Sequence, residues 1–536
     1  MADWTLRRVS SELAERYVAE GWWDHGTLGT MVADGLAERG DVEFHVRSKV
    51  RPWSGTMADV DRLARSFAGR LAADGVGPGD VVVIQLPNWV EAGVAFWAAA
   101  YVGAVVVPVV HFYGAKEVAY ILDATDPAVV ITADRFGLTD HLAVWEGVLA
   151  ERSGPRWLVV GDTPAASLPR RAEPFADLLD GDPIASPAPV DPDSPALIAF
   201  TSGTTKDPKG VIHSHRTITC EARQLNLTFP HGGPPSITGA PVGHFIGMLN
   251  AFVIPLLRDR PVNLVDVWDP GEVLRLMLAE GLGMGGGATY FLTSLLDHPD
   301  FTDEHLALMP FAGLGGSTVP SAVTERAARL GIAVFRSYGS TEHPSITGAS
   351  IDEPEPKRLH TDGHALPGVE MRLDEHGEIS SRGPDCFAGY TDPALTASVF
   401  DDEGWYRTGD VGVLDDDGYL TITDRVSDII IRGGENISAQ EVEELLLGVD
   451  GLAEVAVVAA PDERLGEHAA AFVRLRDGAS APTLEDVRSH LASEGLSKQK
   501  WPESLHVVAG DLPRTPSGKV QKYRLRQSLR DGHPWK

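Results

Sequence analysis

Residues 201–210 read Thr-Ser-Gly-Thr-Thr-Lys-Asp-Pro-Lys-Gly and directly follow residues 196–200, Ala-Leu-Ile-Ala-Phe. The short apolar run is typical of a buried strand. Glycine and small hydroxyl side chains let backbone N–H groups close around an anion, and Lys209 adds a positive charge. The stretch therefore predicts a phosphate-binding loop after a strand, with a solvated polar turn as the alternative. It is not a Walker A loop, because Gly-x-x-x-x-Gly-Lys-Ser/Thr occurs nowhere in the chain.

Helix-like and strand-like patterns alternate on the N-terminal side of this loop. Residues 60–74 carry apolar side chains at helical spacing, and the short apolar runs 81–85, 128–132 and 157–160 have the length of buried strands. Such alternation favours an α/β fold with largely parallel sheets. Residues 165–195 are rich in Pro, Asp and Ser and are expected to form a surface linker.

Residues 92–110 form an apolar run of 19 residues, close to the length that a bilayer requires. Gly103 and Pro108 interrupt the run, and its second half is β-branched. A buried helix, a turn at Gly103 and a buried strand explain this pattern better than a membrane span. The first 20 residues are charged throughout and lack the apolar core of a signal peptide.

The composition excludes several classes of protein. The chain has 536 residues and a net charge of -30, which argues against a nucleic-acid-coating protein and against binding to anionic lipid. Only Cys220 and Cys386 are present, so neither a disulfide scaffold nor a multi-cysteine zinc site is expected. Two cysteines also fit a reducing compartment, and a cytoplasmic location is expected.

The charge is unevenly distributed. Residues 425–536 contain 15 basic and 17 acidic residues, a net charge of -2, so the remainder of the chain carries -28. This asymmetry predicts a boundary near Asp424, with one domain at 1–424 and a second at 425–536. From Lys498 onward the net charge is +6, which is expected either to attract anions or to form a solvated basic face.

Six further short motifs occur in order after the loop at 201–210. Each alone could be a turn or a solvated charged segment. They are Gly315-Gly316-Ser317, Tyr338-Gly339-Ser340-Thr341-Glu342, Tyr406-Arg407-Thr408-Gly409-Asp410, Asp424-Arg425-Val426-Ser427-Asp428, Gly433-Gly434-Glu435-Asn436-Ile437 and Pro513-Arg514-Thr515-Pro516-Ser517-Gly518-Lys519.

Together with the loop, these motifs resemble the adenylate-forming superfamily, which contains acyl-CoA synthetases, peptide-synthetase adenylation domains and luciferases. The resemblance covers nearly the whole chain, and Lys206 departs from the glycine that the family most often has there. It implies an α/β fold with a large N-terminal adenylation domain of several subdomains and a small, mobile α+β C-terminal domain.

The resemblance also implies that ATP and Mg²⁺ bind to the N-terminal domain and to the start of the second. A carboxylate beside nucleotide phosphates is a usual way to place Mg²⁺, which makes Glu342 the expected metal ligand. The nucleotide-binding residues that it implies are Thr201, Ser202, Gly203, Thr204, Thr205, Lys209, Gly315, Gly316, Ser317, Tyr338, Gly339, Asp410 and Arg425.

Catalysis in the implied reaction depends on three residues, Lys519, Thr341 and Glu342. In the family the C-terminal domain swings about a hinge between two half-reactions, and Ser427 occupies the hinge position, where Asp or Lys is usual. The swing takes the catalytic lysine out and brings a glycine loop in to bind CoA. The residues of that loop are Gly433, Gly434 and Glu435.

The acyl pocket of the family corresponds here to residues 241–247 and a later glycine. The residues expected to line it are His244, Phe245, Gly247 and Gly285. Residues 239–251 contain no carboxylate that could hold a substrate ammonium group. The expected substrate is therefore an apolar acid without an amine, and the chain most resembles actinobacterial ligases for medium-chain, alicyclic or steroid-side-chain acids.

Two motifs are expected not to carry chemistry. Residues 281–286 fit Gly-x-Gly-x-x-Gly but follow a helix-like stretch instead of a strand, which argues against NAD binding. His213 and His215 have a ligand-like spacing without a third ligand, so packing is preferred over a metal site.

The sequence thus predicts an ATP-dependent carboxylic acid–CoA ligase whose substrates are a small carboxylic acid, ATP and CoA. The acceptor is expected to be CoA because only 17 residues follow Lys519, which leaves no room there for a fused carrier domain. An acyl-AMP ligase that loads a separate carrier protein or an amine is the alternative, followed by a silent nucleotide-binding protein. The oligomeric state stays open, with a homodimer among the options.

Overall fold

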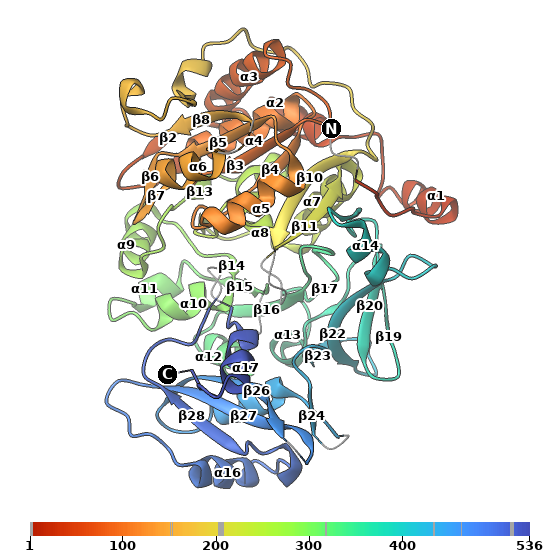
Figure 1. Ribbon diagram of the computed structural model, residues 1–536, viewed down its shortest axis with the longest axis vertical. Coiled ribbons are helices and arrows are strands. Elements are labelled where there is room, and N and C mark those ends of the chain that lie inside the picture. Colours follow the sequence, from red (N-terminus) through yellow and green to blue (C-terminus); the bar gives the residue numbers. More distant parts are fainter. Residues whose placement is uncertain are drawn as a thin grey trace. The chain divides into compact units, whose positions relative to one another are not determined.

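The computed structural model describes residues 4–150, 152, 154–201, 208–316, 319–432, 435–462, 464–514 and 519–535. The chain forms two compact units (Figure 1). Unit 1 comprises Met1–Glu370 and Ser381–Tyr406, and unit 2 comprises Met371–Ser380 and Arg407–Lys536. The predicted domain boundary at Asp424 lies within unit 2, near the end of strand β23 (Leu420–Arg425). The division into sequence domains 1–424 and 425–536 stays a prediction.

An eight-stranded sheet forms the centre of unit 1, in the order β21-β11-β10-β4-β3-β5-β8-β9. The strands from β10 to β9 in this order run parallel, whereas β11 is antiparallel to both of its neighbours. The prediction of largely parallel strands is confirmed. The strands are β3 (Val81–Gln85), β4 (Val105–Pro108), β5 (Val129–Ala133), β8 (Arg156–Val160), β9 (Ala172–Pro174), β10 (Pro195–Thr201), β11 (Lys209–Ser214) and β21 (Gly389–Tyr390).

Helices cover both faces of this sheet. In β3, Val82 and Ile84 belong to the core that contains α3 (Met57–Ala73) and α4 (Val90–Tyr101). Val81 and Val83 belong to a second core, formed with α5 (Ala115–Thr125) and α6 (His141–Leu149). Successive strand side chains point to opposite faces, so a strand covered on both sides is apolar at every position.

The apolar run at 92–110 folds as predicted. Helix α4 is buried along nearly its whole length, Gly103 turns the chain with a φ of 72°, and β4 follows. Within the described part of the chain, no helix has the length and apolar character needed to cross a bilayer. The expected linker at 165–195 is only partly correct, because Ala172–Pro174 pairs with β8 and extends the sheet.

Besides the two-stranded sheet of β6 (Arg135–Phe136) and β7 (Thr139–Asp140), unit 1 contains two larger sheets. The first has the order β12-β13-β1-β2 and the second β14-β15-β16-β17-β18. Their strands are β1 (Glu43–Val46), β2 (Trp53–Thr56), β12 (Ile237–Thr238), β13 (Val262–Leu264), β14 (Gly286–Gly287), β15 (Phe311–Leu314), β16 (Ala333–Tyr338), β17 (Thr347–Gly348) and β18 (His364–Ala365).

The glycines at 281–286 follow a helix, as the sequence predicts. Helix α9 (Pro270–Glu280) ends at Gly281, whose φ of 67° is left-handed. Gly286 pairs with Gly313 so closely that a Cβ there would lie 2.0 Å from the Gly313 carbonyl oxygen. The glycines therefore end a helix and let two strands approach, in place of the strand–glycine–helix order of a dinucleotide site.

Unit 2 is a smaller α+β assembly. Most residues of the sheet β19-β20-β22-β23 belong to it, and the sheet β25-β24-β27-β26, to which β28 adds, is packed with three helices. The elements are β19 (Glu370–Leu373), β20 (Glu378–Arg382), β22 (Tyr406–Leu414), β24 (Ile430–Arg432), β25 (Glu435–Ile437), β26 (Leu452–Asp462), β27 (Gly466–Leu475), β28 (Ser504–Val508), α15 (Ala439–Leu446), α16 (Leu484–Ser493) and α17 (Lys522–Arg530).

Candidate active site

The predicted phosphate loop connects two neighbouring strands. Thr201 at the end of β10 and Lys209 at the start of β11 are register partners in an antiparallel pair. The ammonium group of Lys209 lies 5.7 Å from the centre of the Tyr390 ring, a cation–π contact. Seven predicted site residues lie outside the described residues: Ser202, Gly203, Thr204, Thr205, Ser317, Gly433 and Gly434.

Thr341 and Glu342 lie just after β16, which ends at Tyr338. The Tyr390 hydroxyl donates a hydrogen bond of 2.8 Å to Oε1 of Glu342. Burial, with the neighbouring Glu342 charge, raises the pKa of Tyr390, so the phenol keeps the proton that it donates. One tyrosine thus contacts the cation of Lys209 with its ring and the carboxylate of Glu342 with its hydroxyl.

The motif at 338–342 turns back on itself. Ser340 N–H donates to the His343 carbonyl at 3.0 Å, and Ile346 N–H donates to the Tyr338 carbonyl at 3.1 Å. A Cβ on Gly339 would lie 1.9 Å from the Pro344 carbonyl oxygen, so only glycine fits this turn. Gly315 and Gly316 follow β15, the strand that pairs with β16.

A buried polar network lies directly beyond Glu342. His343 and Asp385 are both fully buried, with 3.2 Å between Nε2 and Oδ1, and Nδ1 of His343 lies 2.8 Å from the Ser381 hydroxyl. Although burial disfavours its charged form, the charge of Asp385 prevails and raises the pKa of His343 to about 10. The Ser345 hydroxyl donates to the buried Glu221 at 2.9 Å. These contacts hold the residues that directly follow Glu342 in the chain, His343 and Ser345.

Glu221→Gln is expected to remove a pH-dependent loss of stability. Burial, with the charge of Asp385, raises the pKa of Glu221 well above its ordinary value. The folded chain therefore keeps this proton where the unfolded chain, with a glutamate pKa of about 4.3, releases it. Stability then falls as pH rises above that value, by about 1.4 kcal/mol per pH unit until the folded-state pKa is reached.

The variant cannot release this proton, so its melting temperature relative to the natural chain should rise from pH 5 to pH 8 in a thermal-shift series. The exposed Glu146→Gln, on α6, is the matched control and should show a constant difference. Parallel curves for Glu221→Gln would show that Glu221 is ionised in the folded chain.

Unit 2 brings Asp410 and Arg425 together. They are register partners on β22 and β23, and Nε of Arg425 lies 2.9 Å from the buried Asp410 carboxylate. Asp428, beside the predicted hinge residue Ser427, pairs with Arg526 of α17 at 2.7 Å. Lys519 is exposed just before α17, and Glu435 begins β25.

Two residues, Gly239 and Ala240, separate β12 from the predicted acyl segment at 241–247. His244 precedes the short helix α8 (Phe245–Met248), which contains both Phe245 and Gly247. The ring of His244 lies 6.0 Å from that of Phe112. Gly285 belongs to a neighbouring strand connection, because Gly283 bridges to Ser236 immediately before β12. The structure therefore brings the first three residues together and places Gly285 on an adjacent segment.

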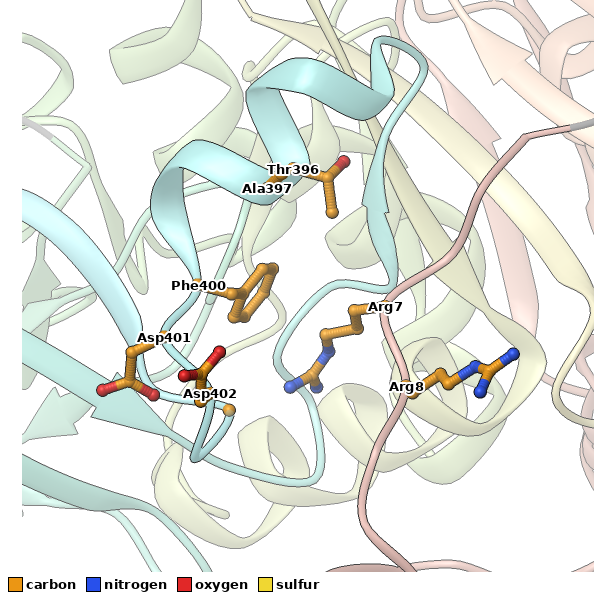
Figure 2. Close-up of a pocket in the computed structure, with 8 residues that line it drawn as sticks. Arg7, Arg8, Thr396, Ala397, Phe400, Asp401 and Asp402 are labelled. Atoms are coloured by element: carbon orange, nitrogen blue, oxygen red, sulfur yellow. The ribbon is translucent and has the colours of Figure 1, made fainter.

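A cleft of about 200 Å³ lies elsewhere in unit 1, between the N-terminal segment and the end of α14 (Pro393–Val399). Figure 2 shows Arg7 directed toward Phe400, and Arg8 directed away. The Arg7 guanidinium carbon lies 5.0 Å from the Phe400 ring centre, and Arg7 also donates to the Cys386 carbonyl at 2.8 Å. None of the predicted site residues that the structure describes lines this cleft.

Sequence reasoning missed Tyr390, His343, Asp385 and the contacts of His213. Tyr390 and Glu342 are 48 positions apart, and His213 lies 128 positions from the residue whose carbonyl it contacts. No local pattern marks such partners. Among the described residues, no group of three or more His, Cys, Asp or Glu could hold a metal ion.

Two protein-family models match the chain. The AMP-binding enzyme family matches residues 39–391, and the AMP-binding enzyme C-terminal domain matches residues 441–519. The medium-chain fatty-acid–CoA ligase of Escherichia coli is 34% identical over 88% of this chain and 86% of its own. A methyl-dioxo-octahydroindenyl-propanoyl:CoA ligase of Rhodococcus jostii is 35% identical over 88% of this chain and 93% of its own.

The fold of this chain also matches that of a solved structure. The crystal structure of ATP-bound MatB from Rhodopseudomonas palustris superposes with a TM-score of 0.83 and 27% identity, covering 95% of this chain and 99% of that one. The same fold and the two family matches, in the order that the motifs predict, show that the chain belongs to the AMP-binding enzyme family.

Proposed function

We propose that this protein is an AMP-forming acid–thiol ligase, which joins a carboxylic acid to CoA at the expense of ATP. The observation that carries the proposal is the placement of Lys209 and Glu342 on one buried tyrosine, Tyr390. A cation for phosphate and a carboxylate for Mg²⁺ then lie at the same part of the sheet edge. CoA ligases are prominent among the curated relatives, which supports the same activity.

In the first half-reaction, the carboxylate of the acid attacks the α-phosphorus of ATP. A C–O–P bond forms, the bond to pyrophosphate breaks, and acyl-AMP and pyrophosphate result. Both reactants are anions, so binding groups must offset their repulsion and hold them in line. We assign this role to Lys209, Thr341 and Lys519. The acid is already ionised, so no general base is required.

The residues present fit Mg²⁺. This ion is usually held by one or two carboxylates together with substrate phosphates, and Glu342 is a single carboxylate held by Tyr390 through Oε1. When bound, Mg²⁺ would neutralise phosphate charge as pyrophosphate leaves. Glu342 would orient it, and Asp410, which forms an ion pair with Arg425 in unit 2, would hold the ribose hydroxyls.

In the second half-reaction, the thiolate of CoA attacks the acyl carbon of acyl-AMP. A C–S bond forms and AMP leaves with the electrons of the C–O bond. Gly433, Gly434 and Glu435 are the proposed CoA-binding residues, and Ser427 is the proposed hinge. These assignments rest on the motif resemblance.

We propose an apolar acid as substrate, of the medium-chain fatty, alicyclic or steroid-side-chain type. The segment around His244 and Phe245 carries no carboxylate for an amine, and the two relatives above act on fatty and bicyclic acids by name. We also propose a cytoplasmic location, since Cys220 and Cys386 are both buried free thiols. The homodimer remains a proposal.

A second candidate function is that of an acyl-AMP ligase, which transfers the acyl group from acyl-AMP to an amine or a carrier protein. The amide bond synthetase McbA from Marinactinospora thermotolerans superposes with a TM-score of 0.81 and 27% identity, covering 94% of this chain. The two candidates share the first half-reaction and differ in the acceptor.

Pyrophosphate release across aliphatic, alicyclic, aromatic and steroidal acids, with and without CoA, tests the proposal. We expect acid-dependent release and, with free CoA, a thioester detected by mass spectrometry. Release without any thioester would favour the second candidate. No release with any acid would contradict both.

Gly339→Ala is expected to slow acyl-AMP formation by about 10- to 100-fold, because relieving the clash with the Pro344 carbonyl displaces the Thr341–Glu342 segment. ATP–pyrophosphate exchange measures this step. Gly77→Ala is the control, since a Cβ at Gly77 meets no atom within 4 Å. An exchange rate equal to that of the control would show that the turn tolerates a side chain.

A further inference from the structure

His213 links β11, the strand that follows the predicted phosphate loop, to the segment that carries Thr341. It lies on β11, four residues after Lys209, and its side chain is fully buried. Its Nε2 lies 2.8 Å from the Thr341 carbonyl oxygen. Strand β11 pairs with β10 on one side and β21 on the other, so the histidine extends from a well-supported strand.

The partners of His213 define its tautomer. A carbonyl oxygen only accepts hydrogen bonds, so Nε2 carries the proton that it donates to Thr341. Burial lowers the pKa of His213 to about 4, so the ring is neutral near pH 7 and Nδ1 is an acceptor. The Thr217 hydroxyl lies 3.2 Å from Nδ1 and 3.2 Å from the Ser214 carbonyl oxygen, so its one proton is shared between these two acceptors. The imidazole therefore bridges Thr217 of helix α7 (His215–Thr228) and the Thr341 peptide.

The other side of the segment is already held. Phe387 N–H donates to the Glu342 carbonyl at 2.8 Å, and His343 is fixed by Asp385 and Ser381. The His213 ring also packs against Phe245 of the predicted acyl segment, with 4.8 Å between ring centres. His213 thus contacts both the segment that would bind the α-phosphate and the segment that would bind the acid.

We propose that His213 is a positioning residue for acyl-AMP formation, holding the Thr341 peptide against β11 through Nε2 and the acyl segment through its ring. The inference rests on the proposed function. His213 would act through Thr341 and Phe245, and this role requires no proton transfer by its imidazole. A displacement of about 1 Å at a reacting centre is enough to slow a reaction about 100-fold.

Two substitutions separate the roles of the hydrogen bond and the ring. His213→Gln keeps an N–H donor for Thr341 but loses the ring, whereas His213→Leu loses both. In ATP–pyrophosphate exchange, we expect His213→Leu to lower kcat about 10- to 100-fold. We expect His213→Gln to retain kcat within about 3-fold and to raise the KM for the acid.

His305 supplies the matched control. It is buried in unit 1, and its Nε2 lies 3.2 Å from a backbone carbonyl, that of Leu274. His305→Leu should lower the melting temperature and leave kcat unchanged. If His213→Leu does not fold, Thr217→Val removes the hydroxyl facing Nδ1 and should lower kcat at least 3-fold without changing the KM for the acid.

The inference is overturned if folded His213→Leu keeps the natural kcat, if His213→Gln is as slow as His213→Leu, or if Thr217→Val, used in place of an unfolded leucine variant, has the natural kcat. Equal losses of kcat in His213→Leu and His305→Leu would also overturn it. Absence of exchange in the natural chain would instead contradict the proposed function, and the inference with it.

Discussion

Lys519→Ala is expected to lower the rate of acyl-AMP formation by at least about 100- to 1,000-fold. The side chain is exposed just before α17, and we assign its ammonium group to the negative charge that develops on the substrate phosphates. Removing one preorganised group that stabilises developing charge costs this much in other enzymes. ATP–pyrophosphate exchange with a substrate acid is the measurement.

The same variant should form the thioester normally from supplied acyl-AMP and CoA, because the second half-reaction transfers no phosphoryl group. Lys498→Ala, which removes an exposed lysine of the same unit, should leave both half-reactions unchanged. Equal losses in both half-reactions of Lys519→Ala would refute the role given to Lys519.

Glu342→Gln is expected to lower acyl-AMP formation by about 100-fold or more and to raise the Mg²⁺ concentration needed for half-maximal exchange. A neutral amide can still accept the hydrogen bond from Tyr390, but it attracts a divalent cation much less. A Mg²⁺ titration of ATP–pyrophosphate exchange separates this effect from a general loss of rate.

Tyr390→Phe is the companion variant. It keeps the ring under Lys209 and removes only the hydroxyl that holds Oε1 of Glu342. Losing one such hydrogen bond corresponds to about 1–3 kcal/mol, so we expect a decrease of about 5- to 150-fold, and a smaller decrease than Glu342→Gln shows in the same assay. An unchanged Mg²⁺ requirement in Glu342→Gln would show that the metal is held elsewhere.

The sequence was most informative about buried strands. Residues 81–85 are predicted and observed as β3 with the same bounds, because a strand covered on both faces is continuously apolar. Helix α3 begins at Met57, three residues before the predicted start, because Thr56 and Asp59 form a capping box ahead of the apolar pattern. Strand β9 has little apolar character, so its composition resembled a linker.

The residues of the candidate site were also predictable only in part. Motifs identify residues that would meet the substrate, such as Lys209 and Glu342. They do not identify the side chains that hold those residues, since Tyr390, His213 and Asp385 act across long separations in the chain. Tertiary contacts of this kind leave no period or spacing in the sequence.

Tyr390 also explains how opposite charges stay available side by side. A lysine and a glutamate in direct contact would neutralise each other, and a ligand would have to separate them before binding. Here the aromatic face receives the ammonium group of Lys209 and the hydroxyl receives the carboxylate of Glu342. The phenol works as a spacer, so an incoming anion and its metal find two oriented charges without first breaking an ion pair.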